Sequence, residues 1–405
     1  MSAAACPLCR RTTFSEVLRL DGVPMEEGRF AATADEAARA MRASVALHHC
    51  TTCGLVYDMA PRVETVEYDG GYSTFMGHSP SFARHVKQTA TRLVERHRLA
   101  GGTVVDIACG FGDFMLALLE SGMARGIGID PAAGESPDPR IQVVREYFSP
   151  GLLPPEASLV SCRHMLYLLD LLDLLDDPVR FLCELRATLV GRDTIVYLEL
   201  MNQSAALQAS DPWDVTYEHR CYFIEESATR LLEVAGFEPI DVRPCHHDRF
   251  LAVEARAAQR PLGGADPTWT SGLTSAVAGL QARADGRIAE WREALAAMRD
   301  AGGRVLAWCA GARAISFLSL AGAGEEVVAV VDVSPSRQGR FIPGSARPVV
   351  GPAAVGELAP QAILVTNAVY TDEIRSDVAA MGLGNLPITE LDDPAAPDAL
   401  VRAVR

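Results

Sequence analysis

The feature that most constrains the fold of this chain is a repeated alternation of short apolar runs with longer amphipathic segments. It fills the middle of the sequence and returns after residue 300. This alternation predicts mostly parallel β-sheets covered by helices, because parallel neighbours are usually joined by helical crossovers. In the middle of the chain the apolar runs are 104–107, 126–129, 158–161 and 194–200. In the last third they are 305–308, 327–333 and 362–365, which predict a second, smaller α/β unit.

Changes in composition and periodicity along the sequence divide the chain into three expected domains. A length of 405 residues already favours two or three domains over one. Residues 1–65 carry four cysteines and irregular polar stretches, 66–255 hold the first alternating block, and 256–405 hold the second. We expect a linker or an exposed crossing at 256–270, followed by one long helix with an apolar stripe over 273–298.

The charge balance argues against two classes of partner. The chain has 37 basic and 52 acidic side chains, a net charge of -15 with His neutral, which repels nucleic acid and anionic membranes. No apolar run reaches the roughly 18 residues that span a bilayer. The first twenty residues lack a basic segment followed by an apolar one, so we expect no export. We expect a cytoplasmic protein that is a monomer or a weak homo-oligomer.

Two CxxC pairs in the N-terminal part predict a metal site. The two-residue gap lets both sulfurs of a pair face one point, and two pairs supply the four thiolates of a closed tetrahedral zinc site. A closed site has no open position for substrate, so its role is structural. The alternatives are four unrelated buried thiols, or replacement of one thiolate by His48 or His49. The predicted ligands are Cys6, Cys9, Cys50 and Cys53.

Residues 104–113 (VVDIACGFGD) predict an apolar strand, a glycine-containing turn and the beginning of a helix. Glycines in the turn allow the backbone to approach a ligand closely. A second strand ends at Asp130, whose carboxylate can accept hydrogen bonds from both hydroxyls of a ribose. The residues that we expect to contact this ligand are Asp106, Ala108, Gly110, Gly112 and Asp130.

Two ligands compete for this turn. A dinucleotide fold would have a third glycine and a helix N-terminus that holds a pyrophosphate. Here Asp113 occupies the beginning of the helix, and its carboxylate would repel a pyrophosphate. An acid at that position suits a ligand with a positive centre and no phosphate, such as S-adenosylmethionine. The structural alternative is a turn whose glycines only permit tight packing.

The segment 213–223 (WDVTYEHRCYF) is dense in polar and aromatic side chains, and with it the chain resembles a known family. That family is the sugar C-methyltransferases of antibiotic biosynthesis, which act on nucleotide-linked keto-deoxysugars. The resemblance extends over nearly the whole chain. Besides the CxxC pairs and the glycine turn it rests on 163–164 (RH), 218–223 (EHRCYF), Asp332 with 339–344 (GRFIPG), and 367–374 (NAVYTDEI).

The resemblance implies an architecture and a reaction. It implies an N-terminal zinc-binding domain, a Rossmann-like methyltransferase core and a C-terminal Rossmann-like domain that helps to hold the sugar nucleotide. The expected methyl donor is S-adenosylmethionine and the expected acceptor is a TDP-linked keto-deoxysugar. The whole chain is therefore expected to be an α/β protein with transferase activity.

Carbon methylation next to a ketone needs a base and hydrogen-bond donors, because the carbon is nucleophilic only after a proton leaves. His219 is the candidate base, since imidazole titrates near neutral pH, and Glu218 can tune or orient it. The alternative is a surface histidine beside a salt-bridging glutamate. Candidate hydroxyl donors are Tyr217, Tyr222 and Tyr72.

The sequence departs from the family pattern around the acceptor. Thr216 stands where many members carry a tyrosine, and Tyr217 lies one residue closer to His219. The turn 108–112 is less polar than usual, and a Leu/Asp run at 166–177 replaces a shorter stretch that contains histidine. These departures leave two further hypotheses open: O- or N-methylation of a sugar or another small metabolite, and a catalytically inactive zinc-ribbon interaction protein.

The second α/β unit predicts a site for a different ligand. Residues 305–314 (VLAWCAGARA) again predict a strand, a turn and a helix, here with a basic residue near the beginning of the helix and no acid. A basic residue there suits a phosphate. We expect Arg313, Arg337 and Arg340 to neutralise the diphosphate of the acceptor. The alternative is a packing domain with surface arginines.

Overall fold

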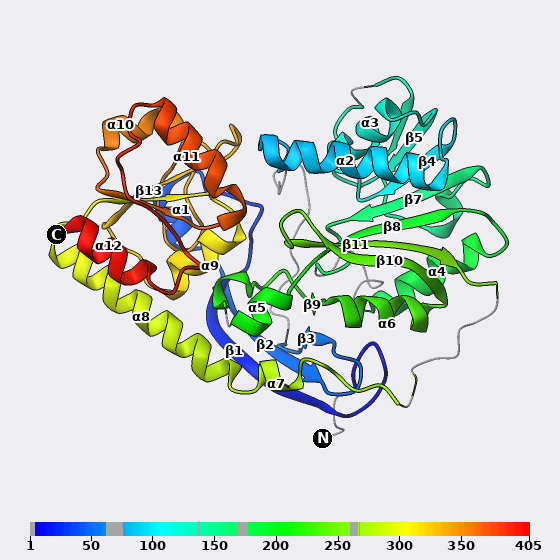
Figure 1. The fold of residues 1–405 in the computed structure, drawn as a ribbon, viewed down its shortest axis with the longest axis horizontal. Helices are drawn as coiled ribbons and strands as arrows, with labels where there is room; N and C mark the ends of the chain where they lie inside the picture. The colour runs from blue at the N-terminus through cyan, green and yellow to red at the C-terminus, as the bar shows by residue number, and fades with distance from the viewer. Residues whose placement is uncertain are drawn as a thin grey trace.

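The computed structural model describes residues 5–61, 76–136, 138–168, 177–209, 211–259, 266 and 268–405. The described chain contains an antiparallel N-terminal sheet and two Rossmann-like α/β units, which confirms the predicted fold class. In Figure 1 the two α/β units form two lobes, and strands β1 to β3 lie below and between them. Among the described helices, none combines the length and the apolar character needed to cross a membrane.

The central sheet has the strand order β10-β11-β8-β7-β4-β5-β6. Strands β4 to β8 are parallel, whereas β11 is antiparallel to both of its neighbours. All residues of β4 and β8 are buried, as expected for strands covered on both faces. The strands are β4 (Thr103–Ile107), β5 (Arg125–Ile129), β6 (Ile141–Val144), β7 (Ala157–Arg163), β8 (Ile195–Met201), β10 (Phe237–Cys245) and β11 (Phe250–Ala257).

Helix α2 begins where a serine-proline pair precedes an apolar stripe. The Ser79 side chain accepts a hydrogen bond from the backbone N–H of Phe82, which satisfies one of the free donors at the helix start. The helices of this unit are α2 (Pro80–His97), α3 (Asp113–Glu120), α4 (Pro178–Leu189), α5 (Ser204–Ala209) and α6 (Glu225–Ala235), with short 3₁₀ turns η1 (Pro150–Leu152) and η2 (Pro212–Asp214).

Two fully buried carboxylates fix α2 to the central sheet. Glu199 of β8 lies 3.1 Å from Nε2 of His85, and Glu254 of β11 lies 2.6 Å from Nε2 of His97. Arg92 also donates to Glu254, at 2.5 Å. Buried carboxylates need such partners, because burial without them costs several kcal/mol. The helix is therefore held in a fixed position against the strands whose carboxyl ends form the site described below.

The second unit is a five-stranded, all-parallel sheet with the order β14-β13-β12-β15-β16. Its strands are β12 (Val305–Trp308), β13 (Val327–Val331), β14 (Val349–Val350), β15 (Ala362–Val365) and β16 (Ile388–Glu390). Its later helices are α9 (Ala312–Leu320), α10 (Val355–Leu358), α11 (Thr371–Ala380) and α12 (Ala396–Val404), with 3₁₀ turns η3 (Pro352–Ala354) and η4 (Ala368–Tyr370).

The long helix predicted over 273–298 is interrupted. It consists of α7 (Thr274–Val277) and α8 (Leu280–Asp300), and the break falls at Gly279, whose φ of +72° is left-handed. Glycine adopts this conformation without steric cost, so the chain turns there. The apolar stripe of α8 is buried as predicted and includes Leu280, Ala284, Ile288, Trp291, Leu295 and Met298.

The N-terminal sheet has the order β1-β2-β3-β9 and recruits its last strand from the middle of the chain. Its core is continuous with that of the second unit, since Leu20 and Val45 belong to the same buried cluster as Trp291. The elements are β1 (Phe14–Pro24), α1 (Ala34–Ala38), β2 (Arg42–Cys50), β3 (Val56–Asp58) and β9 (Cys221–Tyr222).

Candidate functional site

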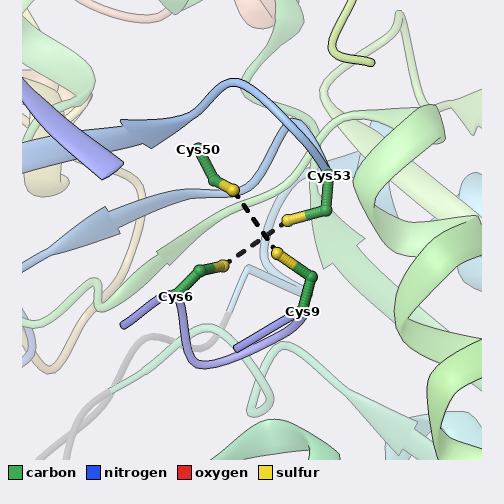
Figure 2. Close-up of side chains that lie close together, drawn as sticks. All are labelled: Cys6, Cys9, Cys50 and Cys53. Carbon is green, nitrogen blue, oxygen red and sulfur yellow. Dashed lines mark hydrogen bonds between the residues drawn. The ribbon is translucent and has the colours of Figure 1, made fainter. Parts of the chain in front are cut away.

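The two CxxC pairs converge on one point. All four cysteine side chains are buried and none forms a disulfide. The sulfurs of Cys6 and Cys53 are 3.5 Å apart, as are those of Cys9 and Cys50. Figure 2 shows that the lines joining these two pairs cross at a common centre. Sulfurs bound to one zinc ion at about 2.3 Å would stand roughly 3.8 Å apart, so the quartet is compatible with a closed tetrahedral zinc site.

The two histidines next to the second pair make other contacts. His49 Nε2 lies 2.9 Å from the hydroxyl of Ser271, and His48 Nδ1 lies 3.1 Å from the carbonyl oxygen of Ala46. The group of potential ligands in this part of the structure is composed of the four cysteines. The predicted set of ligands therefore needs no replacement by an imidazole.

The turn between β4 and α3 has the open backbone that its glycines predict. Gly110 and Gly112 have φ of +53° and +77°, and no heavy atom lies within 4 Å of the position that a Cβ would take at Gly110. Ala108 is also left-handed, with φ of +57°, and its N–H donates to the carbonyl of Ile129 at the end of β5. Left-handed backbone at a non-glycine residue is uncommon and costs energy, so it marks this turn as constrained.

Asp130 lies beside this turn at the carboxyl end of β5. Its Oδ2 accepts a hydrogen bond from the N–H of Gly110 at 2.9 Å, and its Oδ1 accepts one from Ala132 at 2.8 Å. Asp113 is the first residue of α3 on the other side of the turn. The structure therefore places Asp130 beside an open turn and Asp113 at the start of the helix that follows it.

Asp106 lies in strand β4, which leads into the turn, and connects it to the neighbouring strand β7. It is buried within β4, and its Oδ1 accepts a hydrogen bond from the hydroxyl of Ser161 in β7 at 2.6 Å. Burial raises the pKa of Asp106 to about 7, because the charged carboxylate loses its hydration. Asp106 thus links the two strands whose carboxyl ends border the turn.

The carboxyl ends of β7 and β8 carry a charged network that sequence reasoning did not identify. His164, directly after β7, has a left-handed φ of +58°, and its Nε2 lies 3.0 Å from Oε1 of Glu199. Arg163 donates to the same oxygen at 3.2 Å, and the Tyr197 hydroxyl donates to Oε2 at 2.7 Å. These donors hold the pKa of Glu199 well below its usual range despite its burial. Arg163 balances the charge of Glu199, so we interpret this network as ion-paired rather than metal-binding.

The segment around His219 lies between strands of the two neighbouring sheets. His219 forms an isolated β-bridge with Leu168, and Arg220 donates its N–H to the carbonyl of Tyr167. Two residues further on, Cys221 enters β9 and pairs with Tyr57. The segment is thus fixed on one side by the chain that leaves β7 and on the other side by the N-terminal sheet.

The His219 imidazole is buried and uncharged at neutral pH. Its ring is 4.9 Å from that of Tyr167 and 6.1 Å from that of Tyr222, both edge-on. Its Nδ1 is buried and has no hydrogen-bond partner. Burial lowers the pKa of His219 to about 4, although the charge of Asp214 opposes this shift. A neutral imidazole is the form that can accept a proton.

The other predicted side chains of the segment are buried as well. The Tyr222 hydroxyl donates to the Thr216 carbonyl and accepts from its N–H, both at 3.2 Å, so it closes the turn between them. Tyr217 is fully buried in the core that the N-terminal sheet shares with the second unit. Glu218 is fully buried and accepts a hydrogen bond from a distant backbone N–H. Tyr72 lies outside the described residues.

Two buried polar side chains beside this segment were missed by sequence reasoning. Glu27 donates its backbone N–H to Oε1 of Glu218 at 2.6 Å, while its own Oε1 is buried without a partner. Gln203 follows β8, donates its N–H to the Phe223 carbonyl, and has both side-chain amide atoms buried without a partner. Buried polar groups are normally satisfied, so these atoms indicate a ligand or ordered water.

The arginines predicted to bind a diphosphate lie in different environments. Arg313 is buried and forms ion pairs with Asp211 at 2.6 Å, with Asp214 at 2.5 Å, and with Asp392. Three carboxylates therefore compensate its charge without a ligand, and it joins the central unit to the second unit instead. In this arrangement the charge of Arg313 is directed to these carboxylates.

Arg337 and Arg340 lie next to the N-terminal segment. Arg337 donates to Oδ2 of Asp332 at 3.2 Å, and its guanidinium lies 5.2 Å from the ring of Phe30. Arg340 is exposed and donates its N–H to the carbonyl of Arg337. A β-bridge between Ala31 and 341 places this turn against the stretch that contains Glu27.

Comparison with known proteins gives two family matches. A model described as a methyltransferase domain matches residues 82–242, and a model described as the C-methyltransferase C-terminal domain matches residues 272–384. No curated protein matches the chain. The first match covers strands β4 to β8 and part of β10 of the central sheet, with the turn, Glu199 and His219. The second match covers most of the second unit.

Several solved structures share part of the fold. A magnesium protoporphyrin IX methyltransferase from Synechocystis, with bound S-adenosylhomocysteine, is 16% identical over 44% of this chain and 84% of its own, with a TM-score of 0.35. A 1,6-didemethyltoxoflavin-N1-methyltransferase from Burkholderia thailandensis is 18% identical over 50% of this chain and 96% of its own, with a TM-score of 0.34. Mitomycin 7-O-methyltransferase is 21% identical over 44% of this chain and 54% of its own, with a TM-score of 0.33. Likenesses this low leave the acceptor to be argued from the residues of this chain.

Proposed function

We propose that this chain, an S-adenosylmethionine-dependent methyltransferase, methylates a carbon atom next to the carbonyl group of a nucleotide-linked keto-deoxysugar. The observation that carries the choice of carbon is the match of residues 272–384 to the C-methyltransferase C-terminal domain. The buried, uncharged imidazole of His219 supports it, because carbon acceptors of this kind must first lose a proton.

We assign the donor site to the turn between β4 and α3. When bound, S-adenosylmethionine supplies a methyl group on a positively charged sulfur. Asp130 is placed to accept hydrogen bonds from ribose hydroxyls, and Gly110 and Gly112 let the backbone approach the ligand. Ala108 and Asp106 hold the turn in shape from β5 and β7. The negative side chains of the site favour a cationic ligand.

We assign proton removal to His219. Its ring is in the base form at neutral pH and lies edge-on to the ring of Tyr167. The unpartnered amide of Gln203 offers both a donor and an acceptor to hydroxyl groups of a sugar. Arg337 and the exposed Arg340 are the basic groups that we assign to a diphosphate, at the far side of the stretch that contains Glu27.

We assign the cysteine quartet to a structural zinc ion. Four buried sulfurs leave no open coordination position, so the ion would stabilise the N-terminal segment and take no part in the reaction. The proposed division of the chain is a zinc-binding part (1–65), a methyltransferase core (66–255) and an acceptor-binding part (256–405).

The test is a set of TDP-linked keto-deoxysugars incubated with the protein and S-adenosylmethionine. Product mass and NMR should show a new carbon–carbon bond next to the ketone. In heavy water without methyl donor, the same carbon should exchange its hydrogen for deuterium, and His219→Asn should abolish this exchange. A methyl group found on oxygen or nitrogen, or equal exchange by the variant, would contradict the proposal.

A further inference from the structure

Glu27 is a buried acidic residue of the N-terminal segment whose backbone contacts Glu218, the sequence neighbour of the candidate base His219. It stands between β1 and α1 and is 7% exposed. Its backbone N–H donates to Oε1 of the fully buried Glu218 at 2.6 Å. Its side chain and His219 are both influenced by the charges of Asp214 and Arg249. Glu27 and His219 therefore share one buried polar environment.

The charges around Glu27 come from several elements. Glu218 and Asp214 come from the segment 213–223, Arg249 from the turn before β11, and Tyr167 from the chain after β7. Arg249 uses two nitrogens on the carboxylate of Asp214, at 2.7 and 2.5 Å. Among the described residues, no arginine or lysine forms an ion pair with Glu27. Its carboxyl group therefore lies close to other acids and lacks a cation of its own.

The hydrogen bonds of the two glutamates differ. Glu218 receives a backbone donor, which stabilises the carboxylate form. Oε1 of Glu27 is buried and receives no donor, so an ionised Glu27 would leave a buried negative oxygen uncompensated. Burial, followed by the charge of Glu218, raises the pKa of Glu27 well above its usual range. A side-chain hydrogen bond with Thr216 and the charge of Arg249 oppose this rise in pKa but do not cancel it. The unpartnered Oε1 and the nearby Glu218 therefore both favour a neutral Glu27.

We propose that Glu27 is a neutral carboxylic acid whose O–H donates a hydrogen bond to the carbonyl oxygen of the acceptor while His219 removes the neighbouring proton. This inference rests on the proposed function. The position of Glu27 supports this role. Glu27 contacts Glu218, and Phe30, three residues later in the same stretch, contacts Arg337. A sugar nucleotide held by Arg337 would thus pass Glu27 on the way to His219.

The step balances without a further reactant. The C–H bond breaks, its proton moves to the His219 imidazole, and its electron pair moves onto the carbonyl oxygen as an enolate. The enolate oxygen is stabilised by the Glu27 O–H, which keeps its proton. The enolate carbon then forms a bond to the methyl group as the bond from methyl to sulfur breaks, and the sulfur keeps that electron pair as a neutral thioether. The imidazole returns its proton to solvent.

The first experiment tests the protonation state without any substrate. Infrared difference spectra of the full-length protein at pH 7.5, wild type minus Glu27→Gln, should contain the C=O band of a protonated carboxylic acid. Wild type minus Glu26→Gln should lack it, because Glu26 is a neighbouring glutamate that is one-third exposed and lies 3.3 Å from Arg29. A difference spectrum with only carboxylate bands for Glu27 would overturn the proposal, whether or not the acceptor has been identified.

The second experiment tests the role in the reaction. Removal of one hydrogen-bond donor to an oxyanion lowers kcat by about 10²–10³-fold in other enzymes, so Glu27→Ala should lose about that much. Glu27→Gln keeps a neutral hydrogen-bond donor of similar size, so its kcat should fall much less. The KM for S-adenosylmethionine should stay unchanged. In wild type, kcat should fall at high pH as Glu27 ionises, and Glu27→Gln should lack this fall. An unchanged kcat in Glu27→Ala, or the same alkaline fall in Glu27→Gln, would refute the role even if carbon methylation holds.

Discussion

The two α/β units share one backbone design and differ in the side chains that surround it. In each, the first strand is followed by a left-handed non-glycine residue, Ala108 with φ of +57° or Cys309 with φ of +80°. In each, an acid at the end of the next strand accepts a hydrogen bond from the N–H of that turn. Asp130 accepts from Gly110 at 2.9 Å, and Asp332 accepts from Ala310 at 2.8 Å.

The difference lies in what else contacts the acid. Asp130 receives hydrogen bonds from backbone N–H groups, whereas Asp332 is also paired with Arg337 at 3.2 Å. All nine histidines of the sequence precede residue 248, so the second unit has none. The same turn is thus combined with acid–base groups in one unit and with arginine in the other. The backbone fixes where a ligand can lie, and the surrounding side chains decide what it is.

The largest expected effect concerns the buried arginine of the second unit. Arg313→Met leaves Asp211, Asp214 and Asp392 without their shared cation, and loss of one partner from a buried ion pair costs about 3–5 kcal/mol. Chemical denaturation should show this loss in the free energy of unfolding. Arg304→Met, at an exposed arginine that donates to the Leu358 carbonyl, should change it by less than about 0.5 kcal/mol.

The sign of the pH dependence follows from the same carboxylates. Burial already raises the pKa of Asp211 to about 6 while Arg313 is present. Without the arginine, protonation of the acids at low pH relieves the repulsion, so the deficit of Arg313→Met should be smaller at pH 5.5 than at pH 8. A deficit that is equal at both pH values, or as large in Arg304→Met, would show that the ion pairs do not hold the two units together.

A direct comparison of the two acids should give the next largest effect. Asp130→Ala should weaken the binding of S-adenosylmethionine about 100-fold, or roughly 2.7 kcal/mol. The reason is that the variant loses the proposed hydrogen bonds to both ribose hydroxyls. Asp332→Ala should leave donor affinity unchanged. Isothermal titration with S-adenosylmethionine measures both. Equal weakening by the two variants would mean that the units do not divide their ligands as the side chains indicate.

The smallest effect concerns the imidazole of the first unit. Because burial lowers the pKa of His219 to about 4, it stays in the base form above pH 5. kcat/KM should therefore change by less than about twofold between pH 5.5 and 7.5, with an acid limb near pH 4. An exposed histidine would give a limb near pH 6.5. An acid limb of kcat/KM near pH 6.5 that is absent in His219→Asn would contradict this prediction. It would show that bound acceptor or solvent restores the pKa of His219 to its usual value.

Local sequence patterns predicted the parts of the fold whose causes are local. The apolar runs became β4, β5, β7, β8, β12, β13 and β15, and the spacing within each CxxC pair fixed the direction of its sulfurs. The glycine turn was predictable because positive φ and close approach both require small side chains. The break at Gly279 was missed, because the apolar stripe continues on both sides of it.

The rest of the candidate site depends on contacts between residues far apart in the chain. Glu27 and Glu218 are separated by 191 positions, and Arg313 and Asp214 by 99, so no local pattern relates them. Sequence reasoning assigned Arg313 to a phosphate because its position at the beginning of a helix was visible and its three carboxylates were not. The network around Glu199 was missed for the same reason, since His85 lies 114 positions away.

Strand β9 joins the N-terminal sheet, which follows the cysteine quartet, to the segment that contains His219. Cys221, two positions after His219, is paired with Tyr57, which lies four positions after Cys53. Any loosening of the cysteine-bound end would pass along this pairing to the imidazole. A shortened version lacking the first sixty residues would keep the whole central sheet and yet release the segment of the proposed base from one of its two supports. If the quartet holds the proposed zinc ion, chelators should inhibit the protein although the ion lies outside the proposed reaction site.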